Sequence, residues 1–275
     1  MELKPLCIGA LETYPNLLLA PMSGVTNSAF RRLMREENPG ALGLVVTEFV
    51  SVEGLTRQNK RTIGMCRFKE EERPLAVQIF GYDIERICEA GRLVEQEGAD
   101  VLDLNCGCPV PKVVRRGGGC ELMRQPEHMS RMLASLRKAV SLPLSVKIRA
   151  GWDPKSKNAP QIAKIAEDSG VDLITVHGRT RTELYRGEAD WDVVAEVARS
   201  VKVPVVGSGD VVCIESAERA LRSGASGLMI GRGALGNPWI FSDILAASRG
   251  GACFLRDEFQ LIRVLRRYRE LLSEE

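Results

Sequence analysis

The feature of this sequence that most limits its fold is the regular alternation of short apolar segments with longer helical ones. Some of the apolar segments, such as Leu17-Leu18-Leu19 and Val203-Pro204-Val205-Val206, have no polar position at all. Strands of this kind are typical of parallel sheets that are covered on both faces. The predicted strands are Leu17–Ala20, Leu44–Thr47, Leu75–Phe80, Val101–Asn105, Leu144–Ile148, Leu173–His177, Val203–Gly207 and Gly227–Gly231.

The segments between these strands carry helical spacing. Three of them are followed by a glycine that is expected to cap the helix, at Gly98, Gly170 and Gly224. Eight strand–helix units in about 230 residues predict a TIM barrel. A doubly wound sheet is the alternative, but the near-uniform spacing favours the barrel. The predicted helices are Ile84–Gln96, Met129–Val140, Gln161–Asp168, Trp191–Ser200 and Ile214–Leu221.

Composition excludes several classes of protein. Of the 275 residues, 44% are hydrophobic and 27% charged, which is typical of a globular chain rather than a fibrous or disordered one. The net charge is only +2, so any affinity for a polyanion must come from where the charges lie. The N-terminus does not resemble a signal peptide, and no apolar run reaches the ~18 residues of a bilayer span. We therefore expect a cytoplasmic protein that does not enter membranes.

The C-terminal part differs from the rest. We expect residues 1–245 to form the barrel and residues 246–275 to begin a separate helical segment that stops early, as if truncated. Residues Phe259–Leu272 predict an amphipathic helix with several arginines largely on one side. Its other side is expected to carry Leu261, Ile262, Leu265, Tyr268, Leu271 and Leu272.

A TIM barrel carries its active site at the C-terminal ends of its strands. In this sequence nearly every such end is polar or rich in glycine, which a purely structural barrel would not need. We therefore predict an active site there. The strand ends are Ala20–Ser23, Glu48, Gln78, Asn105–Cys108, Lys147–Arg149, His177–Arg181, Ser208–Asp210 and Gly231–Arg232.

Glycine-rich turns follow the last two predicted strands. Gly207–Asp210 and Gly231–Gly233 offer backbone N–H groups where TIM barrels usually bind phosphate. Gly231–Gly236 also matches a dinucleotide-binding motif, but too little chain follows it for such a domain. Lys147 and His177 end neighbouring strands, and we expect them to point into the same mouth.

The eight cysteines are spread through the chain without an export signal, so we expect free thiols. Cys106, Cys108 and Cys120 lack the spacing typical of a zinc site, and we expect no metal. A single active-site thiol beside the basic, glycine-rich loop Val110–Gly119 is the favoured hypothesis. His128, on a predicted helix, is expected to be structural.

Basic residues gather in the loops after the predicted strands. A nearly neutral protein with basic residues on one rim suits a polyanionic substrate, RNA above all. Scattered solvated charges are the alternative. The residues are Lys112, Arg115, Arg116, Arg149, Lys155, Lys157, Arg179, Arg181 and Arg186.

Six blocks of this sequence together resemble the tRNA-dihydrouridine synthases, and most closely their bacterial B-type branch. The resemblance runs in order from about residue 6 to residue 245. The segment Asn105-Cys106-Gly107-Cys108-Pro109 is its most specific part. The blocks are Ala20–Met22, Val77–Gly81, Asp103–Pro109, Val146–Trp152, Val176–Arg181 and Met229–Trp239.

The resemblance implies a TIM barrel that binds FMN, with a small helical domain that grips tRNA and with NADPH or NADH as the reductant. It implies that Cys108 is the catalytic acid and that Asn105 lies beside the reacting uracil. Arg149, Arg179 and Arg181 would contact the base or its backbone. The residues implied for FMN are Pro21, Met22 and Ser23 along the flavin, Gln78 and Lys147 at its ring, and His177, Ser208, Gly209, Asp210, Gly231 and Arg232 at its phosphate end.

The implied reaction reduces the C5–C6 double bond of a D-loop uridine in tRNA, with a hydride delivered to C6 and a proton to C5. A thiol with a pKa near ~8.5 is mostly protonated at neutral pH and can supply that proton. The target base would have to flip out of the folded tRNA. Ser208 stands where the family usually has Asn, so one amide contact is lost. Two alternatives remain: a flavin barrel that reduces a small pyrimidine-like substrate, and an inactive RNA-binding barrel. We expect a monomer.

Overall fold

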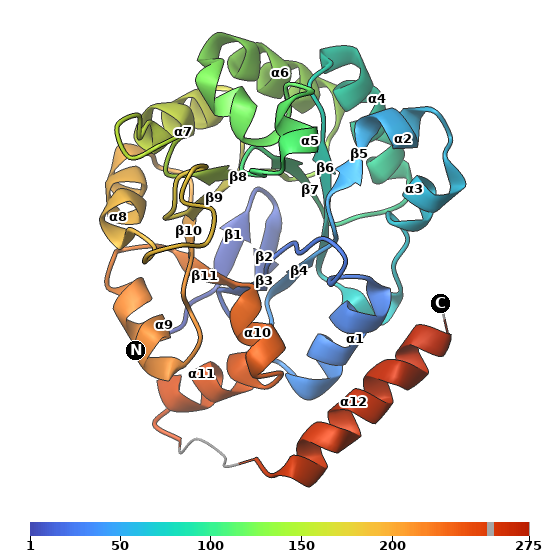
Figure 1. Ribbon diagram of the computed structural model, residues 1–275, viewed down its shortest axis with the longest axis vertical. Helices are drawn as coiled ribbons and strands as arrows, with labels where there is room; N and C mark the ends of the chain where they lie inside the picture. The colour runs from blue at the N-terminus through green and yellow to red at the C-terminus, as the bar shows by residue number, and fades with distance from the viewer. Residues whose placement is uncertain (252–255, 275) are drawn as a thin grey trace.

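The computed structural model describes residues 1–251 and 256–274 and has a closed parallel barrel at its centre (Figure 1). The sheet runs β4-β3-β11-β10-β9-β8-β7-β6-β5, and β4 also pairs with β6, so the barrel closes. The predicted TIM barrel is confirmed. The strands are β3 (Leu17–Leu19), β4 (Leu44–Val46), β5 (Val50–Ser51), β6 (Leu75–Phe80), β7 (Val101–Asn105), β8 (Leu144–Arg149), β9 (Leu173–His177), β10 (Val205–Ser208) and β11 (Gly227–Ile230).

Helices surround this barrel. The predicted helices are all present, with ends shifted by at most a few residues, and the structure adds several that the spacing did not reveal. None of the helices in the described ranges combines the length and the apolar composition that spanning a bilayer requires. The helices are α1 (Ser28–Glu37), α2 (Val52–Thr56), α3 (Lys60–Gly64), α4 (Ile84–Gln96), α5 (Pro111–Val114), α6 (Pro126–Ala139), α7 (Ala159–Asp168), α8 (Trp191–Ser200), α9 (Ile214–Leu221), α10 (Arg232–Gly236), α11 (Ile240–Ser248) and α12 (Glu258–Ser273), with 3-10 turns η1 (Glu70–Glu72) and η2 (Gly119–Arg124).

Three helix ends confirm the predicted glycine caps. Gly98, Gly170 and Gly224 have φ angles of +80°, +85° and +84°. Residues with a side chain rarely adopt this left-handed conformation, which turns the chain from each helix toward the next strand.

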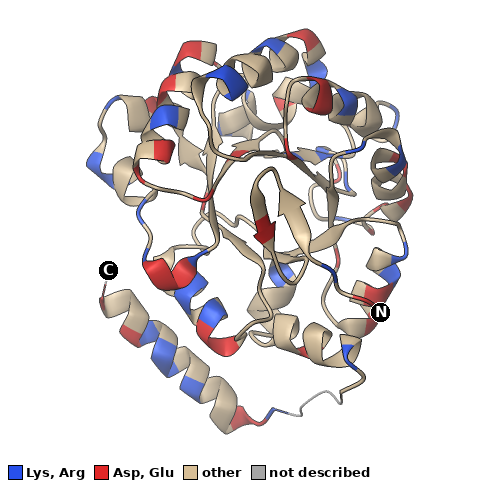
Figure 2. Cartoon of the chain, turned by 180° about the vertical axis from the view of Figure 1, so that it is seen from behind, with Lys and Arg blue, Asp and Glu red and all other residues tan. Residues whose placement is uncertain are grey.

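A small hairpin closes the N-terminal end of the barrel, and it was not predicted. Strands β1 (Leu6–Ile8) and β2 (Leu11–Thr13) are antiparallel, and Figure 2 shows them across the centre of the barrel. Leu6 and Ile8 pack against a cluster inside the barrel that includes Leu18 and Met229. The hairpin thus seals the end opposite to the predicted active site.

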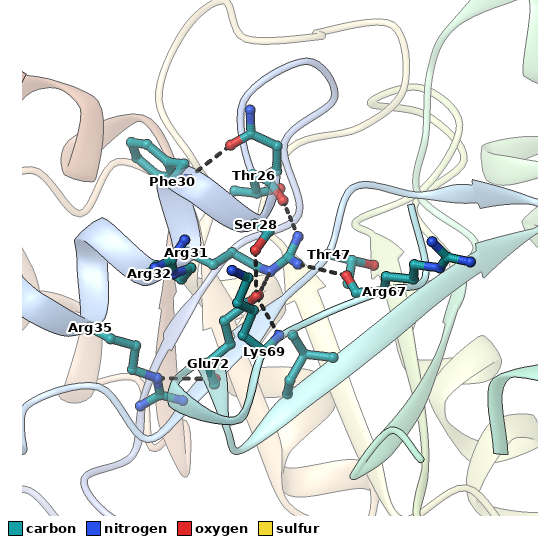
Figure 3. A network of polar contacts seen from close by, with 12 residues as sticks. Thr26, Ser28, Phe30, Arg31, Arg32, Arg35, Thr47, Arg67, Lys69 and Glu72 are labelled. Atoms are coloured by element: carbon teal, nitrogen blue, oxygen red, sulfur yellow. Dashed lines mark hydrogen bonds and ion pairs between the residues drawn. The ribbon is translucent and has the colours of Figure 1, made fainter. Parts of the chain in front are cut away.

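A buried polar network fixes α1 to the turn before β6 (Figure 3). The Glu72 carboxylate accepts hydrogen bonds from Arg31 Nε and Ser28 Oγ, both at 2.6 Å, and from the Lys69 backbone N–H at 2.8 Å. Arg31 also donates to the Thr26 carbonyl at 2.6 Å. Since every polar atom at the ion pair has a partner, this charged pair can be buried.

Helix α12 packs against α1 through only part of the side that the sequence predicted, namely Tyr268 and Leu271, together with Val264. Val264 and Leu271 are buried, and Tyr268 meets Phe30 edge to face at 6.0 Å. Arg267 pairs with Glu36 at 2.8 Å. The contact therefore uses an apolar stripe flanked by an Arg–Glu pair. Four residues of the predicted apolar side, Leu261, Ile262, Leu265 and Leu272, are exposed instead.

Candidate active site

The barrel register brings the predicted strand ends to one mouth. Asn105 on β7 pairs with Lys147 on β8, and Arg149 on β8 pairs with His177 on β9. His177 in turn pairs with Ser208 on β10. The expectation that Lys147 and His177 lie at the same end of neighbouring strands is therefore confirmed.

Behind this mouth, buried polar side chains from β6, β7 and β8 form a continuous chain of hydrogen bonds. Ser145 Oγ and Gln78 Nε2 both donate to the Asp103 carboxylate, each at 2.5 Å. Asn105 Nδ2 donates to Gln78 Oε1 at 2.7 Å. Gln78 and Asn105 thus bind each other. Their contacts with a flavin and a uracil stay predictions.

Asn105 also holds the loop that carries the predicted thiol. Its Oδ1 accepts hydrogen bonds from the backbone N–H groups of Cys108 at 2.9 Å and Gly107 at 3.2 Å. The Cys108 carbonyl accepts from the Cys120 N–H at 3.1 Å. The loop therefore leaves the barrel in a defined direction, continuing into the short helix α5.

All three cysteines of this region are buried. Burial raises the pKa of the Cys108 thiol, raises that of Cys120 to about 12 and raises that of Cys106 well above its usual range. Cys120 Sγ donates to the Gly107 carbonyl at 3.0 Å. These groups are therefore thiols at neutral pH. Within residues 1–251 and 256–274, no three His, Cys, Asp or Glu side chains are grouped as metal ligands.

Lys147 and His177 differ in charge although they are neighbours. Burial, and then the charge of Arg149, lowers the pKa of Lys147 to about 8. Burial and the charges of Lys147 and Arg149 lower the pKa of His177 well below its usual value. At neutral pH the mouth therefore holds an ammonium group beside a neutral imidazole.

Arg149 was expected on an exposed basic rim, and the structure corrects this placement. The side chain is buried, at 3% exposure. Its Nη1 donates to the carbonyls of Thr180 and Leu184 at 2.8 and 2.9 Å, and its Nε donates to the Gly107 carbonyl at 3.0 Å. Carbonyls beyond strand ends lack sheet partners, and a guanidinium can satisfy several at once. Arg149 therefore joins the loop after β9 to the Cys108 loop.

Arg179 is also buried rather than on the rim, at 2% exposure. Its Nη2 donates to Asp210 Oδ2 at 2.7 Å. Asp210 accepts further hydrogen bonds from the Ala189 N–H at 2.8 Å and from Arg232 at 3.3 Å. The carboxylate predicted at a phosphate site therefore orients two arginines across the last three loops.

The phosphate end of the predicted flavin site has features that fit an anion. Arg179 Nη1 is buried and has no hydrogen-bond partner among the described residues. Gly209 has a φ of +135°, and a Cβ on it would lie 2.5 Å from Ala189, so only glycine fits there. Arg232 beside it is exposed. The unpaired donor of Arg179, the bare turn and the exposed guanidinium of Arg232, which Asp210 orients, together suit a phosphate group.

The loop after β3 lies next to the glycine turn that follows β11. A Cβ on Gly231 would meet Met22 Sδ at 3.4 Å. Pro21 and Met22 are half-buried and Ser23 is exposed, so this segment forms one side of the mouth. Ser208 at the end of β10 is nearly buried. The predicted flavin-binding residues are thus near one another, and their contacts with FMN stay predictions.

Sequence reasoning missed Tyr185 in the loop after β9. Its ring is 58% exposed and lies between Arg149 and Arg232, at 5.6 and 4.8 Å from their guanidinium carbons. It also lies 6.3 Å from the His177 ring. An exposed aromatic residue among arginines was the only available signal, and only the fold shows that it stands at the mouth.

The remaining basic residues differ in how free they are. Lys157 pairs with Asp190 at 2.6 Å. Arg181 is half-buried and stacks on Trp152 at 4.7 Å. The set of free basic residues is therefore smaller than predicted: among the described residues, the rim residues that are exposed and form no salt bridge are Lys112, Arg115, Arg116, Lys155 and Arg186.

Comparison with known proteins gives a consistent result. The family model described as "Dihydrouridine synthase (Dus)" matches residues 18–274. A "Probable tRNA-dihydrouridine synthase" from Rickettsia conorii is 44% identical over 239 residues, which are 86% of this chain and 71% of that protein. A protein of the same name from Rhodobacter capsulatus is 42% identical over 89% of this chain and 75% of its own length.

Relatives of the B type are also similar to this chain. The "tRNA-dihydrouridine synthase B" of Pseudomonas putida is 41% identical over 86% of this chain and 70% of its own length. The corresponding protein of Pseudomonas syringae is 40% identical over the same shares. The family model and the relatives thus agree with the resemblance that the strand-end motifs carry, and the chain belongs to the dihydrouridine synthase family.

Proposed function

We propose that this protein reduces a D-loop uridine of tRNA to dihydrouridine, with FMN as its cofactor and NADPH or NADH as the reductant. The names of its relatives support this activity. The observation that carries it is the placement of Cys108 at the barrel mouth, where Asn105 Oδ1 accepts a hydrogen bond from its backbone N–H and the charge of Lys147 acts on its thiol.

The residues at the mouth fit the cofactor. When bound, reduced FMN would supply the hydride for C6 of the uracil. The Lys147 ammonium group provides fixed positive charge for an anionic ring, and a neutral His177 can donate or accept a hydrogen bond. Arg232, the unpaired Arg179 Nη1 and the turns at Gly209 and Gly231 would hold the phosphate.

Cys108 is proposed as the proton donor to C5. Its burial keeps the thiol protonated at neutral pH, which a donor requires. A carboxyl group with its usual pKa would be ionised at that pH and could not serve. Tyr185 is exposed and Arg181 half-buried in the loop after β9, and we propose that a flipped base enters beside them.

The tRNA would bind through charges outside the mouth. The exposed rim offers five cations, and α12 adds Arg266 and Arg269 on an exposed surface. We propose that residues 1–245 are the catalytic domain and that residues 246–275 begin the tRNA-binding part. The second segment includes residues 252–255, which lie outside the described ranges.

The first experiment is an absorbance spectrum of the purified protein before and after NADPH is added without oxygen. We expect a flavin spectrum that bleaches, followed by dihydrouridine formation when unmodified tRNA is supplied. A colourless protein that cannot be loaded with FMN would contradict the cofactor. A reduced flavin that never modifies tRNA, but is reoxidised by a small pyrimidine, would contradict the substrate.

A further inference from the structure

Asp103 is a charged residue within the otherwise largely apolar strand β7, and the proposed chemistry does not use it. Its carboxylate is 3% exposed and accepts hydrogen bonds from Ser145 Oγ and Gln78 Nε2. Both Asp103 oxygens act as acceptors, Oδ1 from Ser145 and Oδ2 from Gln78, so the Gln78 amide turns its NH₂ group toward Asp103. The Gln78 carbonyl oxygen then faces Asn105.

The other end of this series of hydrogen bonds, at Asn105, requires the same direction of donors and acceptors. Asn105 gives its NH₂ group to Gln78, so its carbonyl oxygen faces the backbone N–H groups of Gly107 and Cys108. Backbone N–H groups can only donate, so both ends require one orientation of the two amides. A flipped amide would leave buried donors facing donors, which is costly.

We propose that Asp103 is a positioning residue for Cys108: it sets the direction of the Gln78 and Asn105 amides and so holds the N–H groups where the Cys108 loop begins. The inference rests on the proposed function for the importance of Cys108, while the hydrogen-bond direction stands independently. Its effect would be to fix where the thiol lies relative to the barrel mouth.

The buried surroundings of Asp103 would make a second carboxylate beside it, such as a glutamate in place of Gln78, unfavourable. Burial raises the pKa of Asp103, and its hydrogen bonds with Ser145 and Gln78 and the nearby Lys147 act in the opposite direction. Cys106, at the end of the same strand, is a neutral thiol whose pKa the Asp103 charge raises further. Lys147 is therefore the one charged group that acts on Asp103 from the neighbouring strand, among the described residues.

The sharpest test exchanges the donor at position 78 and the acceptor at position 103 within this series of hydrogen bonds. In Gln78→Glu, two carboxyl groups meet, and a hydrogen bond between them needs one of them protonated. Adding Asp103→Asn supplies an NH₂ group to the new carboxylate, while its carbonyl still accepts from Ser145. The glutamate still accepts from Asn105. Asp103→Asn alone also keeps the direction, because the Ser145 hydroxyl can donate or accept.

The readout is hydrogen exchange of the Gly107 and Cys108 backbone amides in the full chain, each variant compared with the unmodified protein at the same pH. At pH 8 we expect about tenfold faster exchange in Gln78→Glu, because repulsion between two neighbouring carboxylates would move the glutamate away from Asn105 and leave the Asn105 amide less well oriented. The difference should shrink as the pH falls and one carboxyl group takes up a proton. Asp103→Asn should restore slow exchange in the double variant.

Unchanged exchange in Gln78→Glu, or a double variant that exchanges as fast as the single one, would overturn the proposal. Should Gln78→Glu fail to fold at pH 8, we expect Asp103→Asn to restore folding, and a double variant that also fails would overturn it. Variants with faster exchange should have a lower kcat for uridine reduction. The expected exchange pattern in a protein that makes no dihydrouridine would support the positioning role and contradict only the proposed function.

Discussion

The Arg31 guanidinium and the Glu72 carboxylate form an ion pair at 2.6 Å with side-chain exposures of 3% and 0%. The pair joins α1 to the turn η1 ahead of β6. Because α12 packs on α1, the same pair supports the surface that receives the C-terminal helix.

Removal of Glu72 should therefore destabilise the protein strongly. Glu72→Ala leaves a buried guanidinium without its counterion, a change that costs about 3–5 kcal/mol in other proteins. We expect a lower denaturant midpoint in urea unfolding. Glu71→Ala is the matched control, because Glu71 is the neighbouring residue, pairs with Arg32 and is 53% exposed. Equal effects of the two substitutions would contradict a special role for the buried pair.

Cys108→Ala should separate binding from chemistry. We expect the variant to bind FMN and tRNA like the unmodified protein and to reduce uridine about 10²- to 10⁴-fold more slowly, the usual contribution of a general acid. Cys108→Ser should be similarly slow, because a hydroxyl is a much weaker acid. Cys7→Ala, at the exposed far end of the barrel, is the control. Undiminished single-turnover rates in Cys108→Ala would remove this thiol from the mechanism.

The sequence predicted the barrel because its main strands are buried on both sides and most of their positions are apolar. The hairpin β1–β2 escaped prediction because its strands have three residues each and alternate with polar positions. The face of α12 was only partly predicted for a related reason. Its apolar residues extend around much of the helix, and the buried side is the one where Arg263 and Arg267 also meet Glu37 and Glu36 of α1.

The candidate site was predictable only in part. Strand ends of a parallel barrel must share one mouth, so sequence order was enough to gather Lys147 and His177. The partners of Gln78 were not predictable, because they depend on side chains that meet across β6 and β7. Arg149 and Arg179 were misplaced because a loop sequence does not show whether an arginine turns outward or binds carbonyls beneath it.

Arg232 offers a direct test of the phosphate site. Arg232→Ala removes an exposed guanidinium from the turn after β11, and we expect the Kd for FMN to rise about ten- to a hundredfold, the loss of a charge-assisted hydrogen bond. Arg222→Ala is the control, because Arg222 is another exposed arginine, just beyond α9. Fluorescence quenching of FMN measures both. Equal affinities in the two variants would place the phosphate elsewhere.

Lys147 should give FMN binding a pH dependence. Its pKa of about 8 means that the ammonium group is lost as the pH rises through that value, so affinity should fall by about tenfold between pH 7 and 9. Lys147→Met should bind weakly at both pH values. Stability should move in the other direction: the unfolded chain, with a lysine pKa of 10.5, binds more protons between pH 8 and 10.5, so the free energy of unfolding rises there.

The basic rim makes a prediction that depends on where charges lie rather than on how many there are. Lys112, Arg115 and Arg116 are exposed around α5, next to the Cys108 loop. Each phosphate contact contributes about 0.9 to the slope of log affinity against log salt in duplex nucleic acid. Replacing all three with Ala should reduce that slope for tRNA by about two to three.

The control for the rim is a second triple variant with the same change in net charge. Lys4, Lys202 and Arg222 border a cavity near the N-terminal hairpin, away from the mouth. If net charge alone drew tRNA to the protein, both triple variants would lose the same slope. If the loops after the strands hold the phosphates, only the α5 variant loses it, since charges beyond a Debye length of about 8 Å are largely screened at physiological salt.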